Sequence, residues 1–397
     1  MITEELIERN GIRLVNSESI VTFVKSLYAN EYPVALHRPV LGAVEKRYLS
    51  DCIDSNFVSS VGKRVDEFEQ RLASFTGMAR AVVAVNGTAA LHVALEAVGV
   101  TPGSEVITQP LTFAATTNAI SYTGATPAFV DVERETLGLS PEALAAFLEA
   151  GVELREGCAT NRNTGRPVSA CVPVHIYGHP CRTRELADVC GKYNIPMVED
   201  AAEALGSYRD GKHVGGDGIL STLSFNGNKI ITTGGGGAIV TDDSDLADHL
   251  KHITTTAKRP HAYEFFHDRV GYNYRLPNLN AALGCAQMEQ LPRFLEEKRK
   301  IADAYRRFFE DSDMEFIDQP AGCTSNFWLN GILLSTRRER DELLEYSNAN
   351  GVMTRPFWTL MPDLPAFRDA PCAAIPVARE LQERGVALPS SVPPADR

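Results

Sequence analysis

The 397-residue chain lacks the features that would place it in several common protein classes. It contains no run of about 18 apolar residues, the length that a helix needs to cross a bilayer. Its start, MITEELIERNGIRLV, has no basic segment followed by an apolar one, which is the pattern of a secretory signal. Its eight cysteines include no C-x-x-C pair, so buried thiols are expected. We therefore expect a cytoplasmic protein with no membrane partner and no metal.

The chain also lacks an excess of positive charge. It has 51 acidic and 39 basic residues, and no block of like charge is longer than fragments such as KRK at 298–300. A surface that binds nucleic-acid phosphates needs a basic patch or stripe. Nucleic acid is therefore not an expected partner.

Three motifs that often mark ligand sites are incomplete. The glycine run at 234–237 lacks the G-x-G-x-x-G spacing of a dinucleotide-binding turn, and a strand pattern follows it instead of a helix. Residues 206–213, GSYRDGKH, match G-x-x-x-x-G-K but end in His213, where a P-loop has Ser or Thr. His175 and His179 are four residues apart, but the sequence IYGHP between and after them predicts a turn, not a metal-binding helix.

The chain does contain a regular alternation of strand-like and helix-like segments from about residue 66 to 245, such as RAVVAV followed by TAALHVALEAVG. This alternation predicts an α/β domain with a mostly parallel central sheet flanked by helices. After about residue 285, a long charged helix pattern and the strand-like WLNGILLST predict a smaller α+β domain. We expect an N-terminal helical segment at 1–38, a large α/β domain at 39–285 and a small domain at 286–397.

Three polar residues are predicted at the ends of strands. Thr88 follows a strand that ends at Val85, Asp200 ends the strand in IPMVED, and Lys229 follows the strand in ILSTLSFN. Each has an ordinary explanation: a helix N-cap, a solvated carboxylate and a surface lysine. Because ligands bind beyond the carboxyl ends of the strands in such sheets, all three are also expected at the edge where a ligand would lie.

Together these three groups describe a pyridoxal phosphate pocket. Lys229 would carry the cofactor, Asp200 would keep its ring nitrogen protonated, and the helix start at Thr88 would bind its phosphate. Two other classes stay open: a non-catalytic binding or regulatory protein of the same fold, and a nicotinamide-dependent oxidoreductase. A binding protein would not need the amine and the carboxylate beside the phosphate site. The missing glycine fingerprint argues against the oxidoreductase.

Seven segments resemble the DegT-type sugar-nucleotide aminotransferases, which are fold-type I pyridoxal phosphate enzymes: NGTAAL, QPLTFAATTNAI, GATPAFVDV, PVHIYGHP, EDAAEALGS, SFNGNKIITTGGGGAIVTDD and GYNYRLPNLNAALGCAQMEQL. The resemblance covers most of the chain. It implies that Lys229 bears the cofactor and that Ser224 joins Thr88 and the neighbouring Ala89 at the phosphate. Relatives that dehydrate their substrate have His in place of this lysine, so Lys229 implies transamination.

The resemblance assigns roles to further residues. Asp200 would pair with the ring nitrogen, Phe113 would stack on the ring, and Glu203 stands where many members have Gln or His in contact with the ring hydroxyl. Asn273 of GYNYR would reach the cofactor phosphate of the partner subunit, which implies a homodimer with composite active sites. The residues expected to contact the substrate are Lys63, His175, Tyr274 and Arg275.

Within the family, FVSSVGKRVDEFE, EDAAEALGS and the N-terminal extension look most like the C4 aminotransferases of legionaminic-acid or bacillosamine-type pathways. This implies a ping-pong transfer of the amino group of L-glutamate to C4 of a UDP- or GDP-linked 4-keto-6-deoxy-N-acetylhexosamine, for an amino sugar of surface glycans or glycoproteins. The alternatives are transfer at C3 of a related nucleotide-linked keto sugar, and a non-catalytic regulator that binds such ligands.

Overall fold

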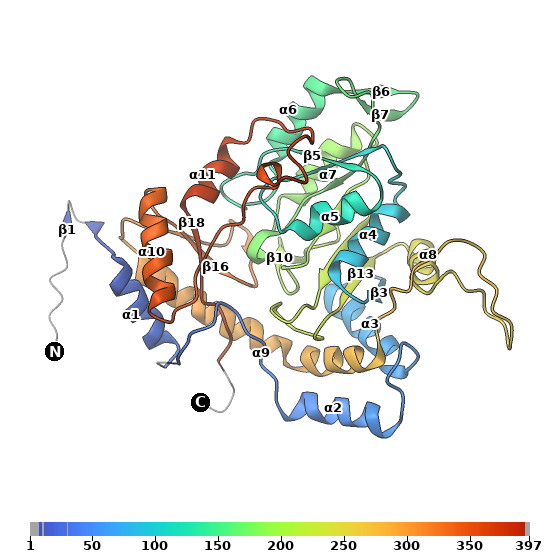
Figure 1. Cartoon of the computed structure of the whole chain (residues 1–397), viewed down its shortest axis with the longest axis horizontal. Helices are drawn as coiled ribbons and strands as arrows, with labels where there is room; N and C mark the ends of the chain where they lie inside the picture. Colours follow the sequence, from blue (N-terminus) through green and yellow to red (C-terminus); the bar gives the residue numbers. More distant parts are fainter. Residues whose placement is uncertain (1–7, 10–11, 30, 394–397) are drawn as a thin grey trace.

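A mixed β-sheet forms the centre of the molecule (Figure 1). The computed structural model describes residues 8–9, 12–29 and 31–393. Strand β13 runs antiparallel to both of its neighbours, while the other adjacent strands are parallel, with isolated bridges joining β8 to β9. Every strand except β13 therefore ends at the same edge. The order is β3 (Arg80–Ala84), β13 (Gly237–Thr241), β12 (Leu220–Ser224), β9 (Val198–Asp200), β8 (Val168–Val172), β4 (Glu105–Thr108) and β5 (Thr126–Phe129).

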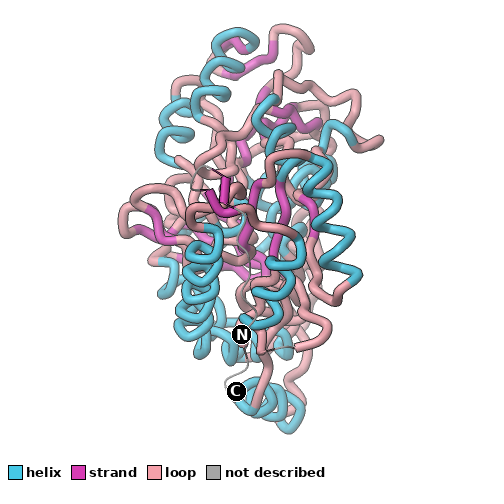
Figure 2. The backbone as a smooth tube through the Cα atoms, turned by 90° about the vertical axis from the view of Figure 1, so that its left-hand side faces the viewer, coloured by secondary structure: helices cyan, strands magenta, loops and turns pink. Residues whose placement is uncertain are grey.

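Helices cover both faces of this sheet, and Figure 2 shows helices on both sides of the central strands. Successive strand residues point to opposite faces. Val82 accordingly packs in the apolar core under α4 and α8, whereas the next residue, Val83, packs in the core under α3 and α9. One face carries α4 (Gly87–Ala97), α5 (Ala114–Tyr122) and α8 (Ser244–Thr254), and the other carries α3 (Lys63–Thr76), α6 (Pro141–Gly151), α7 (Thr183–Gly191) and the first part of α9 (Asn278–Phe309).

A second, antiparallel sheet lies beside the first. Its strands, in order, are β14 (Glu315–Ile317), β16 (Asn330–Leu333), β18 (Gly385–Leu388) and β17 (Arg355–Pro356). Tyr177 of the large-sheet region and Phe357 beside β17 share one apolar core, to which α11 (Pro376–Arg384) contributes. On the other side, α1 (Ser17–Leu27) and α10 (Arg337–Ala349) pack with the second part of α9. The N-terminal helix thus packs against the C-terminal region of the chain.

The predicted division of the chain at 285/286 falls inside α9. Cys285 packs with α3 under the large sheet, whereas Tyr305 of the same helix packs with α1 beside the small sheet. One continuous helix therefore serves both regions, and the domain limits stay a prediction.

The segment that resembles a P-loop in sequence contains a hairpin. Strands β10 (Tyr208–Arg209) and β11 (Lys212–His213) pair antiparallel across the turn, and no helix follows to bind a phosphate. None of the described helices is both long and apolar enough to cross a membrane. The remaining short elements are β1 (Glu8–Arg9), β2 (Ile12–Arg13), β6 (Val152–Arg155), β7 (Cys158–Asn161), β15 (Cys323–Thr324), η1 (Ile176–Gly178) and η2 (Met361–Asp363).

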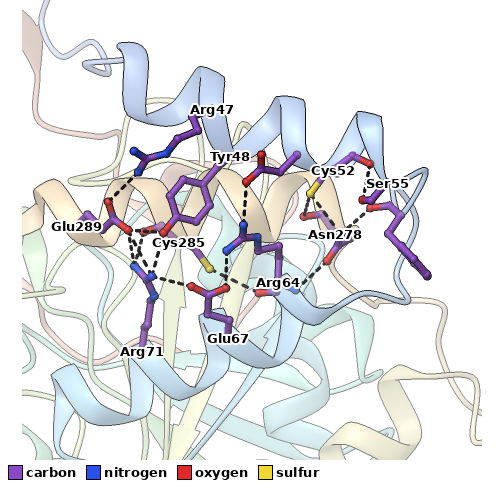
Figure 3. A network of polar contacts seen from close by, with 12 residues as sticks. Arg47, Tyr48, Cys52, Ser55, Arg64, Glu67, Arg71, Asn278, Cys285 and Glu289 are labelled. Atoms are coloured by element: carbon purple, nitrogen blue, oxygen red, sulfur yellow. Dashed lines mark hydrogen bonds and ion pairs between the residues drawn. The ribbon is translucent and has the colours of Figure 1, made fainter.

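Helix α2 (Ala43–Asp54) is fixed to α3 and α9 by a polar network (Figure 3). Arg71 donates to the Tyr48 hydroxyl at 3.0 Å, and the Arg64 guanidinium lies 4.4 Å from the centre of the Tyr48 ring. Asn278 donates to the carbonyl of Phe57 at 2.6 Å and accepts from the backbone N–H of Arg64 at 3.1 Å. These bonds hold the loop between α2 and α3, and they place Lys63 at the start of α3.

Candidate active site

A cavity of about 550 Å³ opens at the edge where β3, β9 and β12 end. Its walls come from the large sheet, from the region of the small sheet and from the N-terminal segment, which contributes Leu36. The predicted site residues that line it are Thr88, Phe113, Asp200, Glu203, Ser224 and Lys229. The parallel strand directions bring these side chains together, since their strands all end at this edge.

Lys229 lies on the cavity wall in a turn after β12. Its backbone N–H donates to the Asn226 carbonyl at 3.0 Å, and its Nζ lies 3.2 Å from Glu203 Oε1. The Nζ atom also lies 3.9 Å from the centre of the Trp328 ring, which is held by a 2.6 Å bond from its indole N–H to the Asn228 carbonyl. The lysine is therefore directed into the cavity by a carboxylate and an aromatic face, unlike a solvated surface lysine.

Asp200 ends β9 at the cavity and is 6% exposed. Its Oδ2 accepts from the Thr116 hydroxyl at 2.8 Å, and its Oδ1 accepts from the Ala202 N–H at 3.1 Å. Burial raises the pKa of this carboxyl, while these two bonds and the charge of Lys229 oppose the increase. This geometry suits a carboxylate that accepts a hydrogen bond from a protonated ring nitrogen on the cavity side.

Glu203 lies three residues after Asp200 and also lines the cavity. Its Oε2 accepts from the backbone N–H of Tyr177 at 2.8 Å, and its Oε1 faces Lys229. Burial raises the pKa of Glu203, and the positive charge of Lys229 opposes the increase. The structure therefore places this side chain against the amine of Lys229.

The phosphate end of the site differs from the prediction in one detail. The N-cap of α4 is Asn86, not Thr88, because Asn86 has extended backbone angles and its Oδ1 accepts from the Ala89 N–H at 2.7 Å. Thr88 lies within the first turn of the helix. The backbone N–H of Ala89, a residue predicted at the phosphate, thus donates to the cap.

Gly87 explains how the helix start approaches Ser224. A Cβ added to Gly87 would lie 2.9 Å from Ser224 Cβ, and a Cβ added to Gly237 would lie 2.5 Å from the carbonyl carbon of Asn86. Only glycine therefore fits at these two contacts without a shift of the neighbouring backbone. Thr88 and Ser224 both line the cavity beside the positive end of α4, and their hydroxyls and this helix start are suitable donors for a phosphate.

His175 does not line the cavity, and a predicted substrate contact from this residue finds no support in the geometry. Its side chain is fully buried, its Nδ1 accepts from the Cys181 N–H at 3.0 Å, and its Nε2 lies 3.0 Å from Glu199 Oε2. Because Nδ1 accepts, the ring proton is on Nε2 and points to the carboxylate. Both ring nitrogens are therefore used inside the protein.

The other predicted substrate and partner contacts lie outside the cavity of their own chain. Asn273 is exposed and forms an isolated bridge with Thr255. Tyr274 stacks on Tyr272 with ring centres 5.0 Å apart, and its carbonyl accepts from the Val85 N–H at 2.9 Å. Lys63 and Arg275 are likewise absent from the residues that line the cavity. Their predicted roles stay predictions.

The cavity residues that the sequence did not predict include Trp328, Arg355 and Trp358. They come from the C-terminal third of the chain, beyond the α/β pattern that located the site. One signal could have indicated the aromatic pair, because the chain has only two tryptophans and both line the cavity.

Comparison with known proteins agrees with this geometry. The model of the DegT/DnrJ/EryC1/StrS aminotransferase family matches residues 39–394. The GDP-perosamine synthase of Escherichia coli O157:H7 is 38% identical over 357 residues, which cover 90% of this chain and 93% of that protein. The GDP-perosamine synthase of Vibrio cholerae is 36% identical over 363 residues, with 90% and 94% covered.

A solved structure of the aminotransferase TlmJ from Streptoalloteichus hindustanus is also similar, with a TM-score of 0.82, 26% identity, and 90% of this chain and 93% of that chain covered. The predicted fold-type I α/β architecture is thereby confirmed. Aminotransferases of this family use pyridoxal phosphate, which confirms the predicted cofactor and the predicted enzyme class. The chain belongs to the DegT/DnrJ/EryC1/StrS aminotransferase family and is a pyridoxal phosphate-dependent sugar-nucleotide aminotransferase.

Proposed function

We propose that the protein transfers the amino group of L-glutamate to C4 of a GDP-linked 4-keto-6-deoxyhexose. The observation that carries this proposal is the cavity that joins Lys229, Asp200 and the start of α4 at one sheet edge. Its volume of about 550 Å³ falls within the range of about 300–1,000 Å³ that is usual for ligand pockets. The cytoplasmic location predicted from the sequence is part of the same proposal.

The names of the relatives support GDP as the nucleotide. Two relatives that match over nine tenths of this chain are named for GDP-perosamine, a GDP-linked amino sugar. They give no support for the N-acetyl group or for the UDP carrier that the sequence resemblance left open. A UDP- or GDP-linked 4-keto-6-deoxy-N-acetylhexosamine is therefore the second candidate, and it is supported by the motif resemblance alone.

The chain's own residues fit the proton transfers of such a reaction. Bound pyridoxal phosphate supplies an electron sink for the pair that remains when a proton leaves the α-carbon of the donor. Lys229 would hold the cofactor and move that proton on its Nζ. Asp200 would keep the ring nitrogen protonated, and the rings of Trp328 and Trp358, which line the cavity, would help to exclude water.

Arg355 supplies positive charge on the small-sheet wall of the cavity. Its Nη1 donates to Asn348 Oδ1 at 3.0 Å and to the Thr354 carbonyl at 2.9 Å. These bonds fix one side of the guanidinium and leave the rest for an anion. We propose that it receives an anionic group of the substrate, either the diphosphate or a glutamate carboxylate.

We also propose a homodimer in which Asn273 completes the phosphate site of the partner subunit. Asn273 is exposed in its own chain, and the segment after α8 that leads to it extends away from the body (Figure 1). This segment exposes large apolar side chains, with Tyr263 80% exposed, Phe265 78% and Val270 86%. Exposed apolar side chains of this density are typical of a surface that a partner covers.

A substrate panel tests the proposed reaction. The purified protein would be given L-glutamate with GDP- and UDP-linked 4-keto-6-deoxy sugars, each with and without a 2-acetamido group. We expect the highest kcat/KM for the GDP-linked sugar without the acetamido group, and NMR of the product should place the new amine at C4. A preference for the acetamido sugars would support the second candidate, and an amine at C3 or no amination of any sugar would contradict the proposal.

A further inference from the structure

The Glu203 carboxylate is buried beside Lys229 and is held there by hydrogen bonds. Its Oε1 lies 3.2 Å from Lys229 Nζ, and its Oε2 accepts from the Tyr177 N–H at 2.8 Å. The side chain of Glu203 is 4% exposed and that of Lys229 is 12% exposed. The contact is therefore shielded from bulk water, and its electrostatic coupling is stronger than that of a surface ion pair.

The backbone around Glu203 is shaped to hold this carboxylate. Tyr177 adopts the left-handed conformation, with φ 56° and ψ 13°, which is unfavourable for a residue other than glycine. The backbone N–H of this residue donates to Glu203 Oε2. The side-chain amide of Asn326 donates to the Glu203 carbonyl at 2.8 Å and fixes the residue from the other side. The protein thus maintains an unfavourable backbone conformation where it positions one oxygen of Glu203.

We propose that Glu203 is a second acid–base residue of the reaction, which takes a proton from the Lys229 ammonium and so frees the amine to act as a base. The proposal rests on the proposed role of Lys229. One proton moves from Nζ to Oε1, the N–H bond breaks and an O–H bond forms, and an ion pair becomes a neutral amine beside a neutral carboxylic acid. The reverse transfer restores the ion pair, so no other reactant is consumed.

The surroundings of Glu203 make both protonation states accessible. Burial raises its pKa, whereas the charge of Lys229 and the Tyr177 N–H oppose the increase. The other titratable groups that face this pair are the Asp200 carboxylate, the Tyr177 phenol and the ring of His37. Burial and the nearby lysine charges lower the pKa of His37, so its ring is neutral. Loss of the positive charge on Lys229 therefore removes the main group that keeps Glu203 ionised.

Infrared difference spectroscopy of the cofactor-free protein tests this coupling without any activity measurement. The carboxylic acid band of Glu203 would be identified by its loss in Glu203→Gln. In Lys229→Met we expect the midpoint at which this band appears to move to higher pH by about one unit or more, because the carboxylate loses its cationic partner. Glu105→Gln is the matched control, since Glu105 is also fully buried and does not line the cavity, and this variant should leave the band unchanged.

Kinetics of the donor half-reaction test whether the coupling serves the reaction. With the cofactor bound, we expect Glu203→Gln to slow the single-turnover reaction with L-glutamate at least tenfold near neutral pH, within the range found for acid–base groups. The isotope effect with α-deuterated glutamate should rise, because proton transfer becomes limiting, and the limb of the pH profile that reports Glu203 should disappear. Glu203→Asp, which keeps a carboxylate, should recover part of the rate, and Glu105→Gln should keep the wild-type values.

Two results would overturn the proposal. One is a Glu203 band whose midpoint does not change in Lys229→Met, and the other is a Glu203→Gln variant with the wild-type pH profile and isotope effect. A failure of the proposed function has a different signature, namely that borohydride fixes no cofactor on Lys229 of the wild-type protein. A loss of structure in Glu203→Gln would change its circular dichroism spectrum and melting temperature. In that case the rate, pH profile and isotope effect of Glu203→Asp test the proposal.

Discussion

At the scale of single residues, two adjacent carboxylates at the end of β9 serve different purposes. Glu199 is fully buried away from the cavity, and its oxygens lie within 3.0 Å of His175 Nε2 and of three backbone N–H groups, those of Gly215, Asp217 and Gly218. Burial works against its ionisation, but these bonds overcome that cost and lower its pKa. Asp200 accepts fewer bonds, and burial raises its pKa. Glu199 thus has a structural role, whereas Asp200 lies at the cavity and can accept a further hydrogen bond.

We predict opposite stability effects for the two amide variants of the cofactor-free protein. Glu199→Gln should lower the free energy of unfolding by about 3 kcal/mol at pH 7, because the new NH₂ group faces backbone donors. Asp200→Asn should leave the stability equal or higher, because it removes a charge that burial disfavours. Chemical denaturation of both variants and the wild type measures this. A Glu199→Gln variant as stable as the wild type would contradict the structural role.

The pH dependence of these differences has a definite sign. The lowered pKa of Glu199 means that its stabilisation is present above its unfolded pKa of about 4.3 and is lost as the pH falls through the folded pKa. The raised pKa of Asp200 means that its favourable contribution is present below about 3.9 and is lost as the pH rises through the folded value. As the pH rises from acidic to neutral, the stability of Glu199→Gln should therefore fall below that of the wild type, and the stability of Asp200→Asn should rise relative to it.

Asp200→Asn should nevertheless lose most of the transaminase activity while it still binds the cofactor. An amide cannot keep the ring nitrogen protonated, so the electron sink is weakened. Steady-state rates with saturating cofactor measure the loss. Activity within a factor of about three of the wild type, or roughly 0.6 kcal/mol in the barrier, would show that another group protonates the ring.

At the scale of elements, the start of α4 depends on a close approach to the end of β12. Gly87→Ala should weaken cofactor binding by about tenfold, or about 1.4 kcal/mol, because the new Cβ would lie 2.9 Å from Ser224 Cβ and push the helix start away. Fluorescence titration with pyridoxal phosphate measures the dissociation constant. Gly191→Ala is the control, since a Cβ there meets nothing within 4 Å, and it should bind as the wild type does. Equal binding by both variants would remove the start of α4 from the phosphate site.

The sequence predicts the ends of the strands well. It predicts the helix N-cap and the cavity residues from distant parts of the chain less well. Strands β9 and β12 are apolar runs bounded by polar residues, so Asp200 and Lys229 could be placed at one edge from local pattern and sheet topology. The cap of α4 was assigned to Thr88 because Asn and Thr are both good caps, and only the backbone angles of Asn86 decide between them. Trp328 reaches the cavity through the packing of the second sheet, which no local pattern reveals.

At the scale of the whole molecule, the proposed composite site predicts complementation between two defective chains. Lys229→Ala removes the amine of one pocket, and Asn273→Asp places a carboxylate against the phosphate in the partner's pocket. A mixed dimer would then hold one pocket with both defects and one with neither. Co-refolded mixtures should recover about half of the wild-type activity per heterodimer formed. If heterodimers form and the mixture is no more active than its parents, Asn273 serves its own subunit or only the interface.

The most direct test of the central claim is whether Lys229 carries the cofactor. Wild-type protein would be mixed with pyridoxal phosphate, treated with borohydride and digested, and the modified peptide would be located by mass spectrometry. We expect a visible absorption band that borohydride removes and a single modified residue, Lys229. The Lys229→Ala protein should fold but show neither the band nor the modification, and it should not transaminate. Modification at another lysine, or transamination by Lys229→Ala at the wild-type rate, would contradict the claim.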